Sequence, residues 1–331
     1  MELNQSVKIS AKERRPDGLG KFYLDVVNGL SVNPKKLSSK YFYDSNGDNL
    51  FQQIMGMPEY YLTRCELDIF SNKTSELANI ATAGLQHPID LIELGAGDAR
   101  KSRFLLRYLV EQGMDFTYVP IDISGNILSV LDKNLRTEMP SIDILPMEGE
   151  YFEMLDRASS LSARKKIVLF LGSNIGNMEL AEAHVFCKRL NTTLNKGDVV
   201  VIGFDLRKNP ATILGAYNDK SGITAAFNLN LLARINNELG ADFDMSQFQH
   251  YQHYDPISGA CRSYLVSLVD QEVTLADQTI HFSENELTYM EVSQKFSQTE
   301  IEQLAKSAGF NSLGILKDGK NWFVDAVWQV K

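Results

Sequence analysis

The chain has 331 residues, which is enough for one large domain or two modest ones. Its hydrophobic content of 44% and its charged content of 23% are typical of a soluble globular protein. A net charge of −9 disfavours a nucleic-acid partner, because such a surface would need a basic face. No apolar run approaches membrane-spanning length, so we expect no membrane partner either.

The composition also favours a metal-free protein of the cytoplasm. Residues 1–15 are polar and charged and lack the apolar core of a signal peptide, so we expect a cytoplasmic location. The three cysteines are far apart and fit neither a disulfide framework nor a metal site. His250 and His253 are close in sequence, but no cysteine or third histidine lies near enough to complete a site. We therefore predict no metal.

Apolar periodicity predicts several helices before the first strand. Residues 1–17 are polar and are expected to form a loose lead-in. Helices are predicted over 18–30, around 50–54 and over 65–82. Between them, the aromatic residues of 41–61 are interleaved with polar groups. This pattern fits a small core under a loop or the wall of a small-molecule pocket, and the core is the favoured interpretation.

A strand, a tight turn and a helix follow at residues 89–112. The apolar run Ile89–Leu94 stops at a Gly-x-Gly turn, Gly95-Ala96-Gly97, and an amphipathic helix comes next. Glycines let the backbone approach a ligand closely, and the start of a helix offers free N–H groups. An acid before such a loop, here Glu93, resembles the pattern of S-adenosylmethionine (SAM) methyltransferases. That pattern next requires an acid at the end of the second strand, which Asp122 supplies.

Two other interpretations of this turn are available. Many strand-to-helix turns use glycine for steric reasons alone. The dinucleotide fingerprint of an NAD-dependent oxidoreductase would need a third glycine where this chain has Arg100, and that argues against it. The loop taken together with the strand-terminal Asp122 favours a nucleotide-type ligand.

Strands and helices continue to alternate up to Asp205. Strands are predicted over 116–123, 142–146, 166–171 and 199–205, and helices over 127–135 and 178–194. This rhythm predicts a doubly wound, Rossmann-like α/β sheet. Ligands bind at the carboxyl ends of the strands in such sheets, and the Gly95 loop, Asp122, Glu150 and Gly172 fall there.

The regular alternation of strands and helices ends at Asp205. Residues 206–248 are predicted to be helical and 261–292 to form antiparallel strands; a helix over 299–308 and a closing β-hairpin follow. We therefore predict a second, smaller, discontinuous α+β domain. Its bounds are 18–62 plus 207–294, and the sheet domain takes 63–206 plus 295–331.

Dispersed motifs go beyond a generic fold. They are Tyr41-Phe-Tyr-Asp, Pro58-Glu-Tyr-Tyr-Leu-Thr-Arg64, Leu171-Gly-Ser-Asn-Ile-Gly-Asn177, Ala216-Tyr-Asn-Asp, Thr224-Ala-Ala-Phe-Asn228 and Glu291-Val-Ser-Gln-Lys-Phe296. With these motifs the chain resembles the SAM-dependent L-histidine Nα-methyltransferases of ergothioneine biosynthesis, from about residue 18 to its end. Relatives in that family methylate other amino acids, including a prenylated tryptophan.

The resemblance implies roles for individual residues. Gly95, Lys101, Asp122, Glu150 and Tyr151 would line the SAM site. Asn177 and Tyr217 would be the catalytic pair that holds the α-amino and α-carboxylate groups of the substrate, with Gly172 nearby. Tyr60, Glu291 and Ser293 would surround the imidazole.

Simpler interpretations of these residues remain. Asn177 could cap a helix that starts at Met178. Lys101 could be a solvated charge on a helix face, and Glu291 could pair with a surface cation. Tyr60 and Tyr217 could be packing residues.

Two positions depart from the family pattern. The family usually has Asp where this chain has Glu150, and a Met near the imidazole where the best match here is Ser263. The smaller serine predicts a roomier or wetter side-chain pocket.

The implied activity is in-line methyl transfer from SAM to the α-amine of L-histidine, with three rounds giving the trimethyl betaine, hercynine. The alternatives are α-N-methylation of another aromatic amino acid and a non-catalytic SAM-binding module. We expect a monomer that acts on a small molecule.

Overall fold

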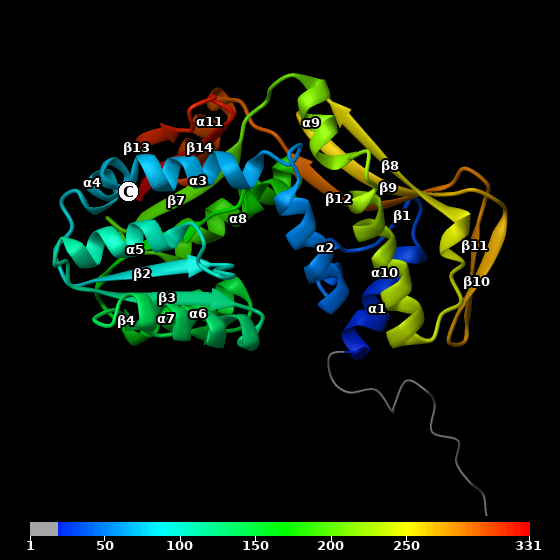
Figure 1. Ribbon diagram of the computed structural model, residues 1–331, viewed down its shortest axis with the longest axis horizontal. Helices are drawn as coiled ribbons and strands as arrows, with labels where there is room; N and C mark the ends of the chain where they lie inside the picture. The colour runs from blue at the N-terminus through cyan, green and yellow to red at the C-terminus, as the bar shows by residue number, and fades with distance from the viewer. Residues whose placement is uncertain (1–18) are drawn as a thin grey trace, which may run out of the picture. The chain divides into compact units, whose positions relative to one another are not determined.

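A computed structural model describes residues 19–331, so the lead-in predicted for residues 1–17 lies outside the described residues. The chain divides into two compact units (Figure 1). The first unit comprises Met1–Tyr60, Pro210–Asp255 and Cys261–Val292, of which the part from residue 19 is described. The second unit comprises Tyr61–Asn209, Pro256–Ala260 and Ser293–Lys331. Along residues 19–331 no helix is both long and apolar enough to cross a membrane.

The second unit is built on an eight-stranded sheet with the order β13-β14-β7-β6-β2-β3-β4, in which β5 also pairs with β3. Its strands are β2 (Ile89–Leu94), β3 (Phe116–Asp122), β4 (Asp143–Ile144), β5 (Met147–Glu148), β6 (Lys165–Phe170), β7 (Val199–Asp205), β13 (Phe310–Lys317) and β14 (Phe323–Val330). The strands β2 to β7 pair in parallel, whereas β14 runs antiparallel to β7 and closes a hairpin with β13. The predicted doubly wound α/β sheet is confirmed.

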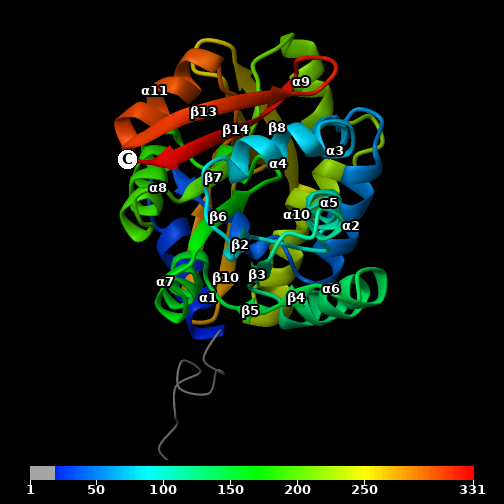
Figure 2. The same cartoon turned by 90° about the vertical axis from the view of Figure 1, so that its left-hand side faces the viewer.

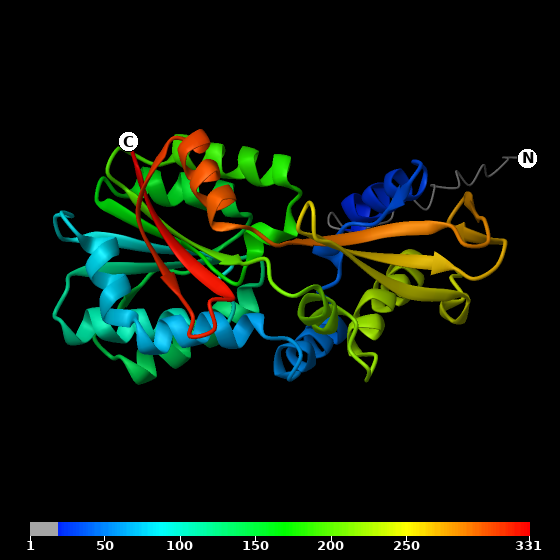
Figure 3. The same ribbon diagram turned by 90° about the horizontal axis from the view of Figure 1, so that it is seen from above.

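Helices cover both faces of this sheet. They are α3 (Leu62–Asn72), α4 (Thr74–Thr82), α5 (Ser102–Glu111), α6 (Gly125–Glu138), α7 (Tyr151–Leu161), α8 (Leu180–Thr193) and α11 (Gln298–Ala308), with the short helix η3 (Asn174–Asn177) after β6. Figure 2 shows α7, α8 and α11 on one side of the strands and α3, α5 and α6 on the other. Figure 3 shows from above that α11 and α8 lie on the opposite side of the strands from α3.

The apolar runs predicted as strands become the buried centre of the sheet. Every residue of β2 and of β7 is buried. This is the pattern of parallel strands that are covered on both faces. Because these strands are parallel, Leu94, Asp122, Phe170 and Asp205 end at one edge, where loops can gather a site.

The first unit is a smaller α+β assembly. Its helices are α1 (Leu19–Leu30), α2 (Ser45–Gly56), α9 (Pro210–Tyr217) and α10 (Ile223–Leu239), with the short helices η2 (Ser39–Tyr41) and η4 (Met245–Gln247). Its strands β1 (Lys35–Lys36), β8 (Phe248–Asp255), β9 (Ala260–Ser267) and β12 (Leu287–Gln294) form a sheet of order β1-β12-β9-β8, and β10 (Gln271–Leu275) pairs with β11 (Gln278–Phe282).

The core of the first unit contains the apolar stripe predicted on α10. Phe227, Leu231 and Ile235 are buried there. Phe42 belongs to the same core, and Tyr41, Phe51 and Tyr60 pack against it. The aromatic segment 41–61 therefore contributes to a core, as the favoured interpretation held.

Three predicted elements were wrong in detail. The stretch expected to be helical over 206–248 contains two helices, α9 and α10, and α10 already ends at Leu239. The single helix expected over 65–82 is two helices, α3 and α4, that meet at Lys73, whose ψ of 19° falls outside the helical range. The third strand expected over 142–146 is reduced to two dipeptides, β4 and β5, because the chain between them contains Pro146, which lacks a ladder donor. Strand β8 was not predicted.

Candidate active site

The loop after β2 and the end of β3 are joined by hydrogen bonds. Gly95 and Gly97 have φ values of 73° and 53°, which glycine adopts without strain. The Gly97 N–H donates to Oδ2 of Asp122 at 3.1 Å, and the Ser124 N–H donates to its Oδ1 at 3.0 Å. The structure therefore brings the predicted loop and the predicted acid together at one edge of the sheet.

Tyr151 closes over this loop from the start of α7. A Cβ atom placed on Gly95 would lie 2.8 Å from the Tyr151 hydroxyl, so the glycine is required sterically as well as conformationally. The Tyr151 ring packs edge-on against Phe170, with 5.7 Å between ring centroids. Burial, together with the charges of Asp122 and Glu150, raises the pKa of Tyr151 to about 12. The phenol is thus a neutral group beside two acids.

Lys101, whose side chain is 20% exposed, forms an ion pair with a buried carboxylate, so the interpretation as a solvated surface charge is wrong. Its ammonium pairs with Glu66 of α3, a residue that is 1% exposed. The Gly172 N–H donates to both carboxylate oxygens of Glu66, at 2.8 and 2.9 Å. Glu66 therefore joins a predicted SAM residue to a predicted substrate residue. Sequence reasoning missed it, because its partners are 35 and 106 residues away.

A second buried acid stands close to this pair. Gly203 of β7 leaves room for Glu66, because a Cβ there would lie 2.3 Å from Oε1 of Glu66. Asp325 of β14 pairs with Gly203 in the ladder and is fully buried, and its carboxylate oxygens accept no hydrogen bond from residues 19–331. Burial, and then the charge of Glu66, raises the pKa of Asp325 well above its ordinary value. Burial therefore favours the protonated, neutral form of the Asp325 carboxyl group.

Glu93, the acid before the glycine loop, is buried and accepts a hydrogen bond from the Tyr118 hydroxyl. Burial is the largest cause that raises the pKa of Glu93 from 4.5 to about 7. The hydrogen bond from Tyr118 opposes that change, because it favours the charged form.

Replacing Glu93 should change how stability depends on pH. Because the folded pKa of Glu93 is about 7 and its ordinary value is 4.5, the folded protein keeps a proton that the unfolded chain releases between these values. The contribution of Glu93 to stability is complete below the unfolded pKa and is lost as the pH rises to the folded pKa. The loss is about 3 kcal/mol, at roughly 1.4 kcal/mol for each pH unit.

We expect the free energy of unfolding of Glu93→Gln to fall less between about pH 5 and pH 8 than that of the unaltered protein, in urea titrations. The exposed Glu153→Gln is the control. Parallel curves for all three proteins would contradict the assignment of a raised pKa to Glu93.

The predicted substrate residues are divided between the two units. Tyr60 and Tyr217 belong to the first unit and contact one another edge-on, with 6.0 Å between ring centroids. Glu291 belongs to the same unit, on β12. Gly172, Asn177 and Ser293 belong to the second unit. One residue separates Gly172 from the end of β6, so Gly172 lies at the same sheet edge as Asp122.

Asn177 does not cap the helix that follows it. It ends η3, whereas α8 begins at Leu180 with Glu179 as its N-cap and Glu182 completing a capping box. The capping interpretation of Asn177 is therefore wrong. Asn177 is exposed and ends the short helix that follows β6.

Ser263 is buried in a polar chain in the first unit. Its hydroxyl donates to Oδ1 of Asn228 at 2.8 Å, and Nε2 of His250 lies 2.7 Å from Oγ of Ser263. Since the serine has one proton to give, His250 is the donor in the second contact. Burial lowers the pKa of His250 to about 4, which keeps its ring neutral. His250 thus has the structural role predicted for it, with Ser263 as its partner.

Cys65, Cys187 and Cys261 are buried, and no disulfide joins them in the part of the chain that the structure describes. Burial raises the pKa of the Cys65 and Cys187 thiols to about 12, which keeps them protonated. Within residues 19–331 no group of three histidine, cysteine or acidic side chains is placed to hold a metal ion.

The sheet order, the antiparallel β14, the glycine loop after β2 and the acid at the end of β3 define a SAM-dependent methyltransferase. The family model described as histidine-specific, SAM-dependent methyltransferase matches residues 22–330. The chain belongs to that family.

Curated relatives align along most of the chain. A histidine N-alpha-methyltransferase of Mycolicibacterium smegmatis is 36% identical over 287 residues, which are 86% of this chain and 87% of that protein. The enzyme of the same name from Mycobacterium tuberculosis is 34% identical over 87% of this chain and 88% of its own length. Ergothioneine biosynthesis protein 1 of Schizosaccharomyces pombe is 30% identical over 85% of this chain, which matches 37% of that longer protein.

Proposed function

We propose that the protein transfers methyl groups from SAM to the α-amino group of L-histidine, in three rounds that end at the trimethyl betaine hercynine. The observation that carries this proposal is the 36% identity to a histidine N-alpha-methyltransferase along 87% of that enzyme's length. A place in ergothioneine biosynthesis is supported by the similarity to ergothioneine biosynthesis protein 1.

The residues of the second unit suit SAM. Gly95 leaves space under Tyr151 that any other side chain would fill, and Asp122 offers a carboxylate at the end of β3. We propose that Gly95, Lys101, Asp122, Glu150 and Tyr151 hold the co-substrate, which supplies the methyl group when bound. Residues 63–206 plus 295–331 would then be the SAM domain, and 18–62 plus 207–294 the substrate domain.

The proposed substrate contacts are chosen for complementary hydrogen bonds. Asn177 and Tyr217 would orient the α-amino and α-carboxylate groups, with Gly172 nearby, and Tyr60 would pack on the imidazole. Glu291 can accept a hydrogen bond from a ring N–H, while Ser293 can serve the other ring nitrogen. Hydrogen bonds to both ring nitrogens would exclude substrates whose side chains leave Glu291 or Ser293 without a hydrogen-bond partner.

The chemistry needs orientation more than it needs acid–base groups. The amine nitrogen must attack in line with the methyl group, so holding it in place supplies much of the rate. The amine must also be neutral, because a protonated nitrogen has no lone pair to attack with. We assign no dedicated base.

The rate of a single turnover should therefore rise with pH through the pKa of the substrate amine. A histidine whose amine is protonated is inert, so the neutral fraction sets the rate. Rapid-quench measurements at saturating SAM give the profile, and the affinity for S-adenosylhomocysteine across the same range is the control. A single-turnover rate that does not change with pH would contradict the neutral-amine mechanism.

The substrate is tested by mass spectrometry after incubation with SAM and L-histidine. Tryptophan, tyrosine and mono- and dimethylhistidine are tested in parallel. Histidine that gains up to three methyl groups supports the proposal. SAM binding with product from another amino acid favours that substrate instead, and binding without any product favours a non-catalytic module.

We also propose a monomeric, metal-free protein of the cytoplasm that binds no nucleic acid. The net charge of −9 supports the last point. Gel filtration with light scattering tests the oligomeric state.

A further inference from the structure

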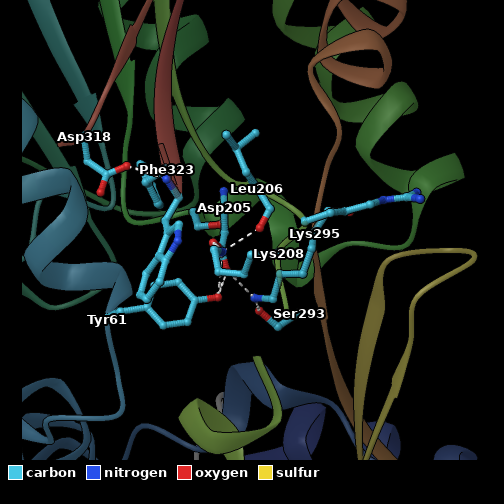
Figure 4. A network of polar contacts seen from close by, with 11 residues as sticks. Tyr61, Asp205, Leu206, Lys208, Ser293, Lys295, Asp318 and Phe323 are labelled. Carbon is cyan, nitrogen blue, oxygen red and sulfur yellow. Dashed lines mark hydrogen bonds and ion pairs between the residues drawn. The ribbon is translucent and has the colours of Figure 1, made fainter. Parts of the chain in front are cut away.

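A fully buried carboxylate, Asp205, collects three polar side chains at the end of β7 (Figure 4). Nζ of Lys295 lies 2.8 Å from Oδ2 of Asp205, and Nζ of Lys208 lies 2.5 Å from Oδ1. The Tyr61 hydroxyl donates to Oδ2 at 2.8 Å. Sequence reasoning placed Asp205 at the end of a strand but assigned it no role.

This cluster holds two lysines and one carboxylate. The Lys295 side chain is fully buried, and that of Lys208 is 5% exposed. Burial lowers the pKa of Lys208, and Asp205 opposes that change. A buried ammonium requires more than one acceptor, because it has three protons to place and has lost its water.

Each lysine also donates to groups other than Asp205, and these groups differ between the two lysines. Lys208 donates to the backbone oxygen of Leu206 at 2.5 Å and to the Tyr61 hydroxyl at 2.9 Å. Lys295 donates to Oγ of Ser293 at 2.8 Å. Only Lys295 therefore joins Asp205 to a residue that is predicted to contact the substrate.

The bond from Lys295 sets the direction of the Ser293 hydroxyl. An ammonium has protons but no lone pair, so toward Lys295 the serine oxygen must accept. The serine proton then points away from Lys295. Ser293 is consequently presented as a hydrogen-bond donor to whatever group it meets on its other side.

We propose that Lys295 is a positioning residue that makes Ser293 the donor to the unprotonated ring nitrogen of the substrate imidazole. This inference rests on the proposed histidine methyltransferase function. Ser293 would donate to one ring nitrogen while Glu291 accepts from the N–H of the other. A serine that donates in this way recognises a ring nitrogen that carries no proton, and the neutral imidazole has one such nitrogen.

The chain supplies a matched pair of variants for the test. Lys295→Met and Lys208→Met each remove one buried ammonium from Asp205, but of the two lysines it is Lys295 that donates to Ser293. KM and kcat for histidine are measured for both variants, for Ser293→Ala and for the double variant Ser293→Ala/Lys295→Met. The affinity for S-adenosylhomocysteine and the thermal midpoint report on the integrity of the fold.

We expect Lys295→Met and Ser293→Ala each to raise KM for histidine about tenfold, with kcat changed by less than about threefold, as for the loss of one hydrogen bond to the substrate. Lys208→Met should leave KM within about twofold of the unaltered protein. The double variant should be no worse than Ser293→Ala, because Lys295 acts through Ser293.

Equal increases in KM for Lys208→Met and Lys295→Met would overturn the proposal, and so would effects that multiply in the double variant. If Lys295→Met does not fold, Lys295→Arg keeps the charge on Asp205 but displaces the donor. It should still raise KM, and an unchanged KM for it would also overturn the proposal. If the unaltered protein binds S-adenosylhomocysteine but methylates no histidine, the proposed function fails instead.

Discussion

Asp205→Ala should lower the free energy of unfolding by about 3–5 kcal/mol, the range for breaking a buried ion pair from one side. The change leaves the ammonium groups of Lys208 and Lys295 buried without their carboxylate. Chemical unfolding at neutral pH measures the loss.

Asp198→Ala is the matched control, because Asp198 lies immediately before the same strand and is equally buried. It accepts backbone N–H groups from Lys166 and Asn195, and no ammonium of residues 19–331 pairs with it. Its removal leaves only neutral donors without a partner and should cost about 1–3 kcal/mol. A loss for Asp205→Ala that is no larger than the loss for Asp198→Ala would show that the buried charge does not dominate.

Lys101→Met should both destabilise the protein and weaken its binding of SAM. Among the described residues it leaves the buried Glu66 carboxylate with the Gly172 N–H as its remaining partner, which should cost about 3 kcal/mol. Because Lys101 is also a proposed SAM contact, we expect the affinity for S-adenosylhomocysteine to fall at least about tenfold. Unfolding and titration calorimetry measure the two effects separately.

The double variant Glu66→Gln/Lys101→Met separates these roles. A neutral glutamine can still accept the Gly172 N–H, so most of the lost stability should return. The affinity for S-adenosylhomocysteine should stay low if Lys101 contacts the co-substrate. Recovery of both stability and affinity would instead make Lys101 a purely structural partner of Glu66.

The sheet was predictable because its parallel strands are buried on both faces. Runs such as Ile89–Leu94 and Val199–Asp205 are apolar enough to be recognised locally. The break at Lys73 and the shortness of β4 and β5 were not predictable from the sequence, because tertiary packing and local backbone geometry decide where such elements end. Strand β8 alternates polar and aromatic residues without a strong apolar signal.

The candidate site was predictable where a local pattern or a family motif marks it. Asp122 follows an apolar run, and the loop of Gly95 and Gly97 is a sequence-local turn. Glu66 was missed because its importance comes from partners far away in sequence. Asp205 has the same strand-terminal position as Asp122, yet only the fold shows that two lysines are buried against it.

The central claim is methylation of the α-nitrogen of histidine, and NMR of the product tests it most directly. The protein is incubated with L-histidine and SAM that carries a ¹³C-labelled methyl group. We predict labelled methyl groups on the α-nitrogen only, ending in a single trimethylammonium signal. Label on a ring nitrogen, or unlabelled histidine recovered beside protein that binds S-adenosylhomocysteine, would contradict the claim.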